Sequence, residues 1–243
     1  MKKALVVGGS NGIGLAIVNN LKTLNHVYII DKSEPDMILP PNVSFEKFDL
    51  TEFDYSIFDK YDDIDTLMIT AGFGHISLFR DIDENTIVNY FNVNTIATIR
   101  IIKHFYERML SRTDFFCGVM VSISGFMSSP FFSVYGATKA ALNIFIQSVN
   151  VEMEKAGTSN RILNVSPGSI KGTKFDKGAV HDFLQTDALA NEIVRNLKNK
   201  NDLFIPNFEG VFKDVLERAH TDFRKEGLHS YDYKVEQGRT NFK

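Results

Sequence analysis

Short apolar runs alternate along the chain with longer segments whose apolar residues recur every three or four positions. The short runs span four to nine residues and are bounded by glycine, proline or polar residues, a pattern typical of buried β-strands. We expect strands at 4–7, 26–31, 43–50, 65–72, 115–123, 161–168 and 203–206.

The longer segments predict helices at 12–25, 83–110 and 135–157. The second of these is long enough for a helix pair or one bent helix, and the third ends at Gly157, a common helix stop. In the first segment one helix face carries the apolar residues Ile13, Ile17, Leu21 and Leu24.

The alternation of strand and helix predicts an α/β fold with a doubly wound parallel sheet of about seven strands and helices on both faces. Residues 54–65 leave little room for a full helix between the third and fourth strands. Because no internal repeat or linker interrupts the pattern, we expect residues 1–243 to form a single domain. The last residues, about 221–243, mix charge with scattered tyrosines and could fray or dock on a neighbouring subunit.

The turn between the first strand and the first helix reads VVGGSNGIG. Gly8 permits a sharp exit from the strand, Gly12 lets a pyrophosphate approach the backbone at the helix N-terminus, and Gly14 permits close packing of the helix on the strand. The turn therefore predicts a Rossmann-type dinucleotide site. Its other members are Ser10, Asn11 and Ile13.

Asp31 ends the second strand, 17 residues after Gly14. A carboxylate at this position accepts hydrogen bonds from both hydroxyls of the adenosine ribose and repels a 2′-phosphate. Residues 31–65 contain eleven acidic and three basic residues, and Asp31 competes with any phosphate for the adjacent Lys32. We therefore expect NAD as the cofactor, and NADP is the less favoured alternative.

Three motifs together resemble the short-chain dehydrogenase/reductase family over nearly the whole chain. The glycine spacing is G-x-x-x-G-x-G, the segment FNVN contains Asn94, and the segment YGATK places Tyr135 and Lys139 four residues apart. The resemblance implies a nicotinamide-dependent oxidoreductase with a site formed by a serine, a tyrosine, a lysine and an asparagine.

The resemblance also implies further cofactor contacts. Asp49 and Leu50 resemble the family's adenine-contacting pair, and Ala71 and Gly72 stand at the end of the fourth strand. The segment SPGSIKGT resembles the part of the family that wraps the nicotinamide. It supplies Pro167, Gly168, Ile170 and Thr173.

Three positions depart from the family pattern. Val7 stands where the family has threonine before its first motif glycine, so a side-chain hydrogen bond is missing there. Ile69 and Thr70 replace the two asparagines of the family's N-N-A-G segment. Because those asparagines support the strand rather than the reaction, we expect the chemistry to be retained.

The spacing of Tyr135 and Lys139 has a physical reason. A free tyrosine has a pKa of about 10, too high for a base near neutral pH. An ammonium group one helix turn away favours the phenolate, so we expect Lys139 to lower the pKa of Tyr135. In the family, the lysine also holds the nicotinamide ribose, and the asparagine, here Asn94, fixes a water that links the lysine to solvent.

Two serines are candidates for the group that hydrogen-bonds the substrate oxygen. Ser122 lies 13 residues before Tyr135, the usual interval in the family, and Ser124 lies 11 residues before it. Four large apolar residues follow these serines. They have two interpretations of equal weight: contact with an apolar substrate, or packing in the core beneath the loop. They are Phe126, Met127, Phe131 and Phe132.

Composition excludes several classes of function. The net charge is −3, with 44% hydrophobic and 23% charged residues, which gives no reason to expect nucleic acid or an anionic membrane as a partner. No apolar stretch approaches 18 residues, and the apolar run at 4–7 is too short for a signal core. Cys117 is the only cysteine and no histidine pair has metal-ligand spacing, so we expect a cytoplasmic protein without disulfide or metal.

The sequence thus predicts a hydride transfer between NAD(H) and a secondary alcohol or ketone. The alternatives are the same enzyme with NADP, or a dinucleotide-binding sensor or scaffold with little catalysis. The partners expected are a small-molecule alcohol or carbonyl substrate and a second copy of the chain. The two long helices carry ample apolar surface, which predicts a homodimer or homotetramer.

Overall fold

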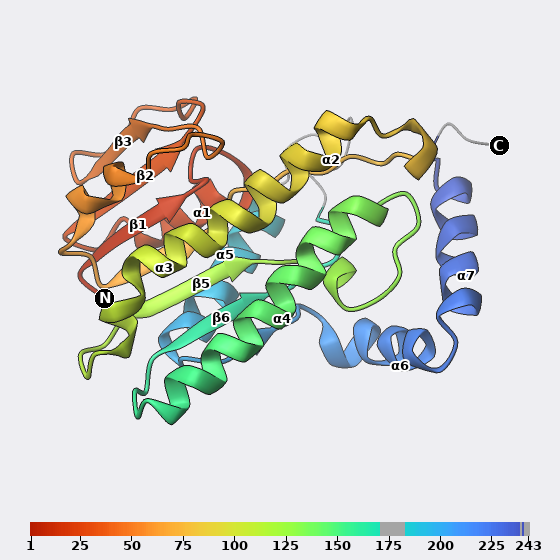
Figure 1. Cartoon of the computed structure of the whole chain (residues 1–243). Coiled ribbons are helices and arrows are strands. Elements are labelled where there is room, and N and C mark those ends of the chain that lie inside the picture. Colours follow the sequence, from red (N-terminus) through yellow and green to blue (C-terminus); the bar gives the residue numbers. More distant parts are fainter. Residues whose placement is uncertain (171–182, 239, 241–243) are drawn as a thin grey trace.

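The computed structural model describes residues 1–170, 183–238 and 240. Within them, strands of one parallel sheet follow the order β3-β2-β1-β4-β5-β6-β7, which confirms the predicted α/β fold with a Rossmann-like sheet (Figure 1). The strands are β1 (Lys3–Val7), β2 (His26–Asp31), β3 (Val43–Lys47), β4 (Thr66–Ile69), β5 (Phe116–Met120), β6 (Arg161–Val165) and β7 (Leu203–Phe204).

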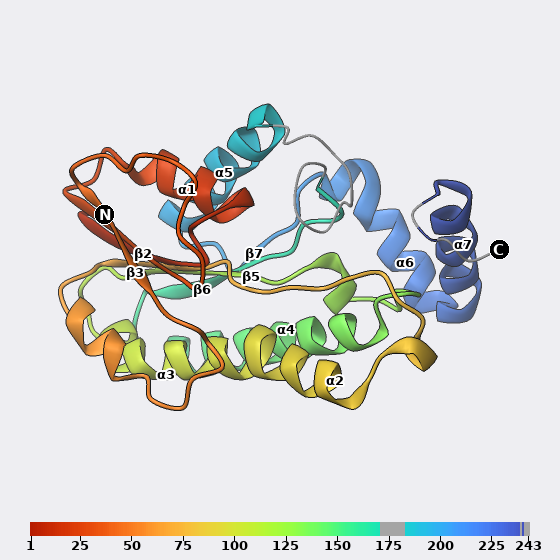
Figure 2. The ribbon, with the colours of Figure 1, turned by 90° about the horizontal axis from the view of Figure 1, so that it is seen from above.

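Helices cover both faces of the sheet (Figure 2). On one face lie α1 (Gly12–Leu21) and α5 (Phe183–Lys198), which pack over a core that includes Ile17 and Ile193. On the other face lie α2 (Glu84–Phe91), α3 (Ala97–Leu110) and α4 (Ser133–Lys155). Two further helices, α6 (Lys213–Thr221) and α7 (Phe223–Glu236), stand beyond the carboxyl ends of the strands (Figure 1).

The structure changes several predicted boundaries. The helix expected at 83–110 is bent, because a π-helical turn at Asn92–Ile96 joins α2 to α3. Only a short 3-10 helix, Ser56–Tyr61, lies between β3 and β4, as the limited room predicted. The sequence did not lead us to predict α5, α6 and α7, and the residues of α6 and α7 are mostly exposed and polar.

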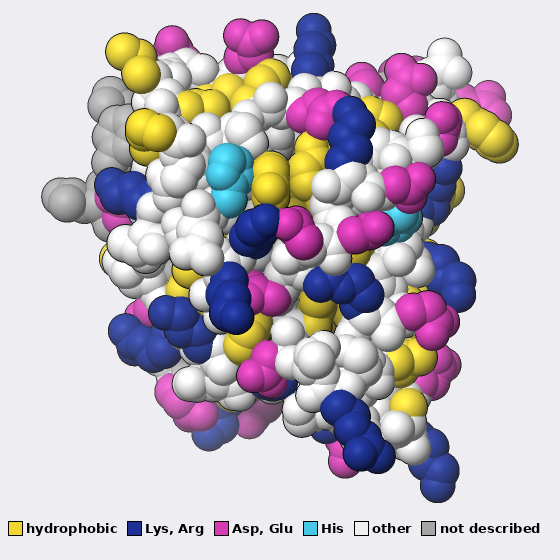
Figure 3. Space-filling view, turned by 90° about the vertical axis from the view of Figure 1, so that its left-hand side faces the viewer, with side chains coloured by type: hydrophobic (Ala, Val, Ile, Leu, Met, Phe, Trp, Pro, Cys, Tyr) yellow, Lys and Arg dark blue, Asp and Glu magenta, His cyan; other side chains and the backbone are white. Residues whose placement is uncertain are grey.

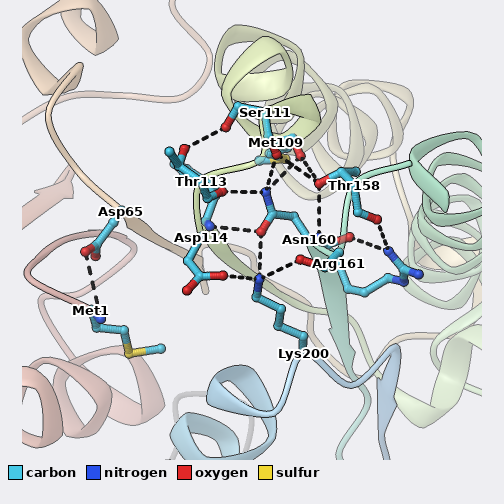
Figure 4. Close-up of polar contacts among 12 residues, drawn as sticks. Met1, Asp65, Met109, Ser111, Thr113, Asp114, Thr158, Asn160, Arg161 and Lys200 are labelled. Atoms are coloured by element: carbon cyan, nitrogen blue, oxygen red, sulfur yellow. Dashed lines mark hydrogen bonds and ion pairs between the residues drawn. The ribbon is translucent and has the colours of Figure 1, made fainter. Parts of the chain in front are cut away.

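A buried side chain joins the elements at the amino-terminal edge of the sheet (Figure 4). The Asn160 amide, 1% exposed, accepts a hydrogen bond from the Phe115 backbone N–H at 3.0 Å and donates to the Met109 and Thr113 carbonyls at 3.0 Å. Lys200 Nζ also donates to Asn160 Oδ1 at 3.0 Å. These bonds tie the starts of β5 and β6 to the ends of α3 and α5.

The face that shows the amino ends of the strands carries basic and acidic side chains side by side (Figure 3). Such a mixed surface offers no block of one charge on that side for a polyanion. In the part of the chain that the structure describes, no helix combines the length and apolar character needed to cross a bilayer. Nor do the described acidic, histidine and cysteine side chains gather in a metal-binding group of three or more.

The sheet order reverses between β1 and β4, which are neighbours in the sheet. In a doubly wound sheet such a reversal leaves a crevice at the carboxyl ends of the two strands, because their following segments turn to opposite faces. The glycine turn follows β1 and the segment 70–78 follows β4. The topology thus places the dinucleotide motif beside the residues that follow β4.

Candidate active site

The glycine turn packs closely against the segment after β4. Gly8 has φ +88°, and a Cβ on it would lie 2.4 Å from the Ala71 backbone nitrogen. A Cβ on Gly14 would lie 2.1 Å from the Gly8 carbonyl oxygen. Any larger residue at either position would push the turn away from β4, which is the close approach that the sequence predicted.

Thr70 makes two hydrogen bonds that the sequence did not reveal. Its hydroxyl lies 3.1 Å from the Val7 carbonyl oxygen and 3.0 Å from the Gly8 carbonyl oxygen and donates to them. A residue that departs from the family pattern therefore ties β4 to the glycine turn. It offsets the side-chain bond that is lost where Val7 replaces a threonine.

The turn has room and polar groups for a pyrophosphate. The Ser10 hydroxyl is buried and has no hydrogen-bond partner among the described residues. Gly12, at φ +54°, has open space where a Cβ would stand, and the N-cap Asn11 makes no side-chain capping bond to α1. An orphaned hydroxyl and uncapped N–H groups at a helix N-terminus fit a bound phosphate group.

Asp31 lies beside this turn at the end of β2. Its Oδ2 accepts a hydrogen bond from the Ser10 N–H at 3.2 Å, and its Oδ1 accepts one from the Ser33 N–H at 3.3 Å. These long bonds leave the carboxylate oxygens able to accept hydroxyl groups as well. Asp49 follows β3 nearby, and the Thr51 N–H and hydroxyl, bonded to its carboxylate, hold its pKa below the ordinary value.

Asn94 and Lys139 both reach the small space behind Gly72. Asn94 is fully buried, and its amide accepts from the Phe73 N–H and donates to the Phe73 carbonyl, both at 2.9 Å. Lys139 Nζ donates to the Met120 carbonyl at 2.9 Å. A Cβ on Gly72 would lie 3.2 Å from Asn94 Oδ1 and 3.4 Å from Lys139 Nζ, so both groups border the same small space.

Ser122 and Tyr135 also lie together. The Ser122 side chain, mostly buried, hydrogen-bonds the Tyr135 hydroxyl and accepts a bond from the Ser124 N–H at 3.2 Å. The structure thus brings Ser122, rather than Ser124, to the tyrosine. Lys139 Nζ lies 5.7 Å from the centre of the Tyr135 ring.

The electrostatics of the pair differ from the expectation drawn from spacing. Burial raises the pKa of Tyr135 to about 12, although the bond from Ser122 opposes the rise, and burial lowers the pKa of Lys139 to about 8. The expectation that Lys139 brings the pKa of Tyr135 below its ordinary value is wrong for the chain alone. Burial takes both groups out of water and disfavours both ions, and it is the largest cause of each shift.

The remaining predicted cofactor residues are dispersed around the same edge. Leu50 packs on the core beside β3, and its carbonyl accepts a bond from Tyr55. Pro167 follows β6, and its carbonyl accepts from the Ile123 N–H at 3.0 Å. Gly168 lies against the ring of Phe212, and Ile13 and Ile170 pack on the α1 face. Thr173 lies outside the described residues.

The four apolar residues after Ser122 do not form one surface. Phe131 is 3% exposed, and its ring lies 4.5 Å from that of Tyr231 in α7, so core packing applies to it. Phe126, Met127 and Phe132 line a cavity of about 660 Å³ together with Gly136 and neighbouring residues of α4. None of the four proposed catalytic residues lines this cavity, which faces another side of α4.

Tyr90 supports the site from α2, and the sequence analysis missed it. Its ring is fully buried and stacks on Phe73 at 4.7 Å, and its hydroxyl accepts a bond from the His75 N–H at 3.0 Å. Because Phe73 also holds Asn94, Tyr90 fixes the segment that borders the space behind Gly72. Its position one helix turn before Asn94 is the only signal that sequence offered.

Comparisons with known proteins agree with this geometry. The family model for short chain dehydrogenases matches residues 2–183. An uncharacterized oxidoreductase of Saccharomyces cerevisiae is 27% identical over 189 residues, a match that spans 71% of this chain and 61% of the yeast protein. An uncharacterized oxidoreductase of Staphylococcus epidermidis is 25% identical over 192 residues, or 72% of this chain and 82% of that protein.

Solved structures share the fold. A short-chain dehydrogenase from Streptomyces avermitilis has a TM-score of 0.75 at 21% identity, over 99% of this chain and 100% of that one. A short chain dehydrogenase from Burkholderia cenocepacia, solved with NADP, has a TM-score of 0.77 at 18% identity, over 95% and 98% of the two chains. The chain belongs to the short-chain dehydrogenase/reductase family, a family of NAD(P)-dependent oxidoreductases.

Proposed function

We propose that the protein transfers a hydride between NAD(H) and a secondary alcohol or ketone, with Asn94, Ser122, Tyr135 and Lys139 as its working residues. The observation that carries the proposal is the pair of hydrogen-bonded hydroxyls of Ser122 and Tyr135. This pair lies at the carboxyl edge of the sheet, as does the glycine turn with its unpartnered Ser10 hydroxyl. A hydroxyl pair of this kind can bind one carbonyl or alcohol oxygen from two directions.

The chain's own groups have separable tasks in the reaction. The bound nicotinamide supplies or takes the hydride. Ser122 donates a hydrogen bond to the substrate oxygen, and Tyr135 donates its proton to that oxygen in reduction or accepts it in oxidation. Lys139 would bind the nicotinamide ribose, and its charge would favour the phenolate. Asn94 holds the segment at Phe73 and would orient a water that links Lys139 to solvent.

The raised pKa of Tyr135 fixes its resting protonation state near neutral pH. With its pKa raised to about 12, Tyr135 is protonated and ready to donate. Oxidation needs the phenolate, so in that direction the positive charge of the oxidised nicotinamide is required to lower the pKa.

NADH is expected to bind at least about tenfold more tightly than NADPH, since Asp31 repels a 2′-phosphate and bonds the ribose hydroxyls. Calorimetric titration of the protein with each dinucleotide measures the two dissociation constants. The matched control is the Asp31→Asn variant, which keeps the shape of the side chain and removes its charge. It should bring the dissociation constants of NADH and NADPH closer together. Tighter binding of NADPH by the unmodified protein contradicts the Asp31 argument.

A panel of secondary alcohols and ketones, followed at the absorbance of the reduced nicotinamide, tests turnover. The second candidate function is a dinucleotide-binding sensor or scaffold, favoured by the raised pKa of Tyr135 and by the departures at Val7 and Ile69. It predicts dinucleotide binding without turnover across the panel. Turnover of any panel member in a Tyr135-dependent manner excludes the sensor.

We also propose a homodimer or homotetramer formed through α3 and α4. Side chains that point away from the sheet include Ile96, 47% exposed, just before α3, and Ile144 and Val151, 61% and 70% exposed, on α4. Large apolar side chains exposed on neighbouring helices are typical of an interface. Light scattering at micromolar concentration is expected to give at least twice the 27.5 kDa chain mass. A monomer mass overturns the proposal.

A further inference from the structure

The helices after β7 form an extension of their own. Residues 208–236 lie beyond the 2–183 segment that the family model matches. α6 and α7 are joined by Arg218, whose Nε and Nη2 donate to the two carboxylate oxygens of the mostly buried Glu226 at 2.7 and 3.1 Å. Asp222 caps the start of α7 by accepting from the next backbone N–H groups. A two-point ion pair and a cap hold the two helices in one arrangement.

This extension docks on the loop that runs from β5 to α4. Ser128 Oγ donates to the Phe223 carbonyl at 3.2 Å, and a Cβ on Gly227 would stand 3.2 Å from Ser128 Oγ, so α7 approaches the loop closely. Farther along α7, Lys234 Nζ donates to the Pro130 carbonyl at 2.9 Å and to Ser129 Oγ at 3.2 Å. The contacts thus follow the loop toward the start of α4.

The docked part of the loop includes a residue in a rare backbone conformation. Phe131 has φ +69°, which a residue with a Cβ adopts only when its surroundings impose it. Two neighbours hold it: its carbonyl accepts from the Ser77 N–H at 3.0 Å, and its ring lies 4.5 Å from the ring of Tyr231. Ser77 belongs to the segment after β4 and Tyr231 to α7, so the conformation depends on both sides of the site.

The strained residue is four positions from Tyr135. Phe132 follows it, accepts the first backbone bond of α4 from the Gly136 N–H, and has its ring 5.7 Å from that of Tyr135. Lys234 Nζ also lies 5.4 Å from the centre of the Phe132 ring, within reach of a cation–π contact. A shift at 130–132 would therefore move the first turn of α4, which carries the tyrosine.

We propose that Lys234 is a positioning residue, through which the C-terminal extension sets the place of Tyr135. Its ammonium group holds the Pro130 carbonyl and the Phe132 ring together, and this fixes the strained peptide between them. Among the described residues, Lys234 contacts Ser129, Pro130 and Phe132, in the loop before α4. The role rests on the proposed function, because Tyr135 is the group whose position matters for turnover.

The test compares Lys234→Met, Lys234→Arg and the matched control Lys225→Met, an exposed lysine of the same helix. Hydrogen-exchange mass spectrometry of the full chain is expected to show at least about tenfold faster exchange in 131–136 for Lys234→Met. Peptides that cover β1 and α1 should be unchanged, Lys234→Arg should recover most of the protection, and Lys225→Met should match the unmodified protein. This readout needs no substrate, so it tests the docking even if the oxidoreductase proposal fails.

The kinetic arm uses any panel member that the protein turns over. Misplacing an acid–base group by less than 1 Å lowers turnover by about tenfold or more. We expect Lys234→Met to lower kcat by about that factor with the NADH dissociation constant within about twofold, and Lys234→Arg to restore kcat. Unchanged exchange in 131–136, unchanged kcat, or a parallel loss of NADH binding and of protection across the whole chain each overturns the proposal.

Discussion

Replacing Tyr135 with phenylalanine is expected to lower kcat by about 10²–10⁴-fold, the range that general acid–base groups contribute. The substitution removes only the hydroxyl that hydrogen-bonds Ser122, and the ring keeps its packing beside Phe132. The NADH dissociation constant and the urea midpoint should therefore stay close to those of the unmodified protein. Stopped-flow turnover, calorimetry and urea unfolding measure the three quantities.

The matched control is Tyr28→Phe, which removes a tyrosine hydroxyl from β2, a strand that β1 and β4 separate from β5 in the sheet. It should leave turnover unchanged. Full activity of Tyr135→Phe would show that another group moves the proton. Loss of NADH binding in Tyr135→Phe would show instead that the tyrosine acts on the dinucleotide and not on the substrate oxygen.

Replacing Lys139 with methionine is expected to lower turnover by at least about 100-fold and yet to stabilise the dinucleotide-free protein. Burial lowers the pKa of Lys139 from 10.5 to about 8, so at pH 7 the fold holds a buried ammonium group at a cost. Methionine fills a similar volume without that cost. We expect a gain of about 1–3 kcal/mol in the free energy of unfolding at pH 7.

The stability difference between the unmodified protein and Lys139→Met is expected to decrease as the pH rises. Below pH 8 the lysine is protonated in both states and the folded protein carries the full penalty. Between pH 8 and 10.5 the folded lysine loses its proton before the unfolded one, so the unmodified protein gains stability as pH rises and the difference between the two proteins shrinks. Tyr135, whose pKa is raised, lowers stability only above pH 10, in both proteins.

Urea unfolding at pH 7 and pH 10.5 measures the difference, with Lys22→Met, an exposed lysine that follows α1, as the control. A less stable Lys139→Met at pH 7 would mean that the bond to the Met120 carbonyl outweighs the cost of burial. A gain that persists at pH 10.5 would mean that packing, not charge, causes it.

The spacing of the glycines predicted the dinucleotide turn, because the conformation of such a turn depends only on residues close together in the sequence. Gly8, Gly12 and Gly14 are needed by one turn between one strand and one helix, and the structure shows the close approach at Gly8 and Gly14. The departures from the family were harder to interpret. In the sequence, Thr70 only replaces one of the family's asparagines. Its hydrogen bonds to the Val7 and Gly8 carbonyls depend on the position of β4 beside β1, which the structure shows.

The sequence by itself determined the α/β order, the glycine turn, and the spacing of Tyr135 and Lys139, because periodicity and helix geometry are properties of neighbouring residues. Tertiary structure decided which serine meets Tyr135, how α7 reaches the loop before α4, and the direction of the two pKa shifts. Those outcomes depend on how completely distant elements exclude water from a group, and no spacing along one chain specifies that.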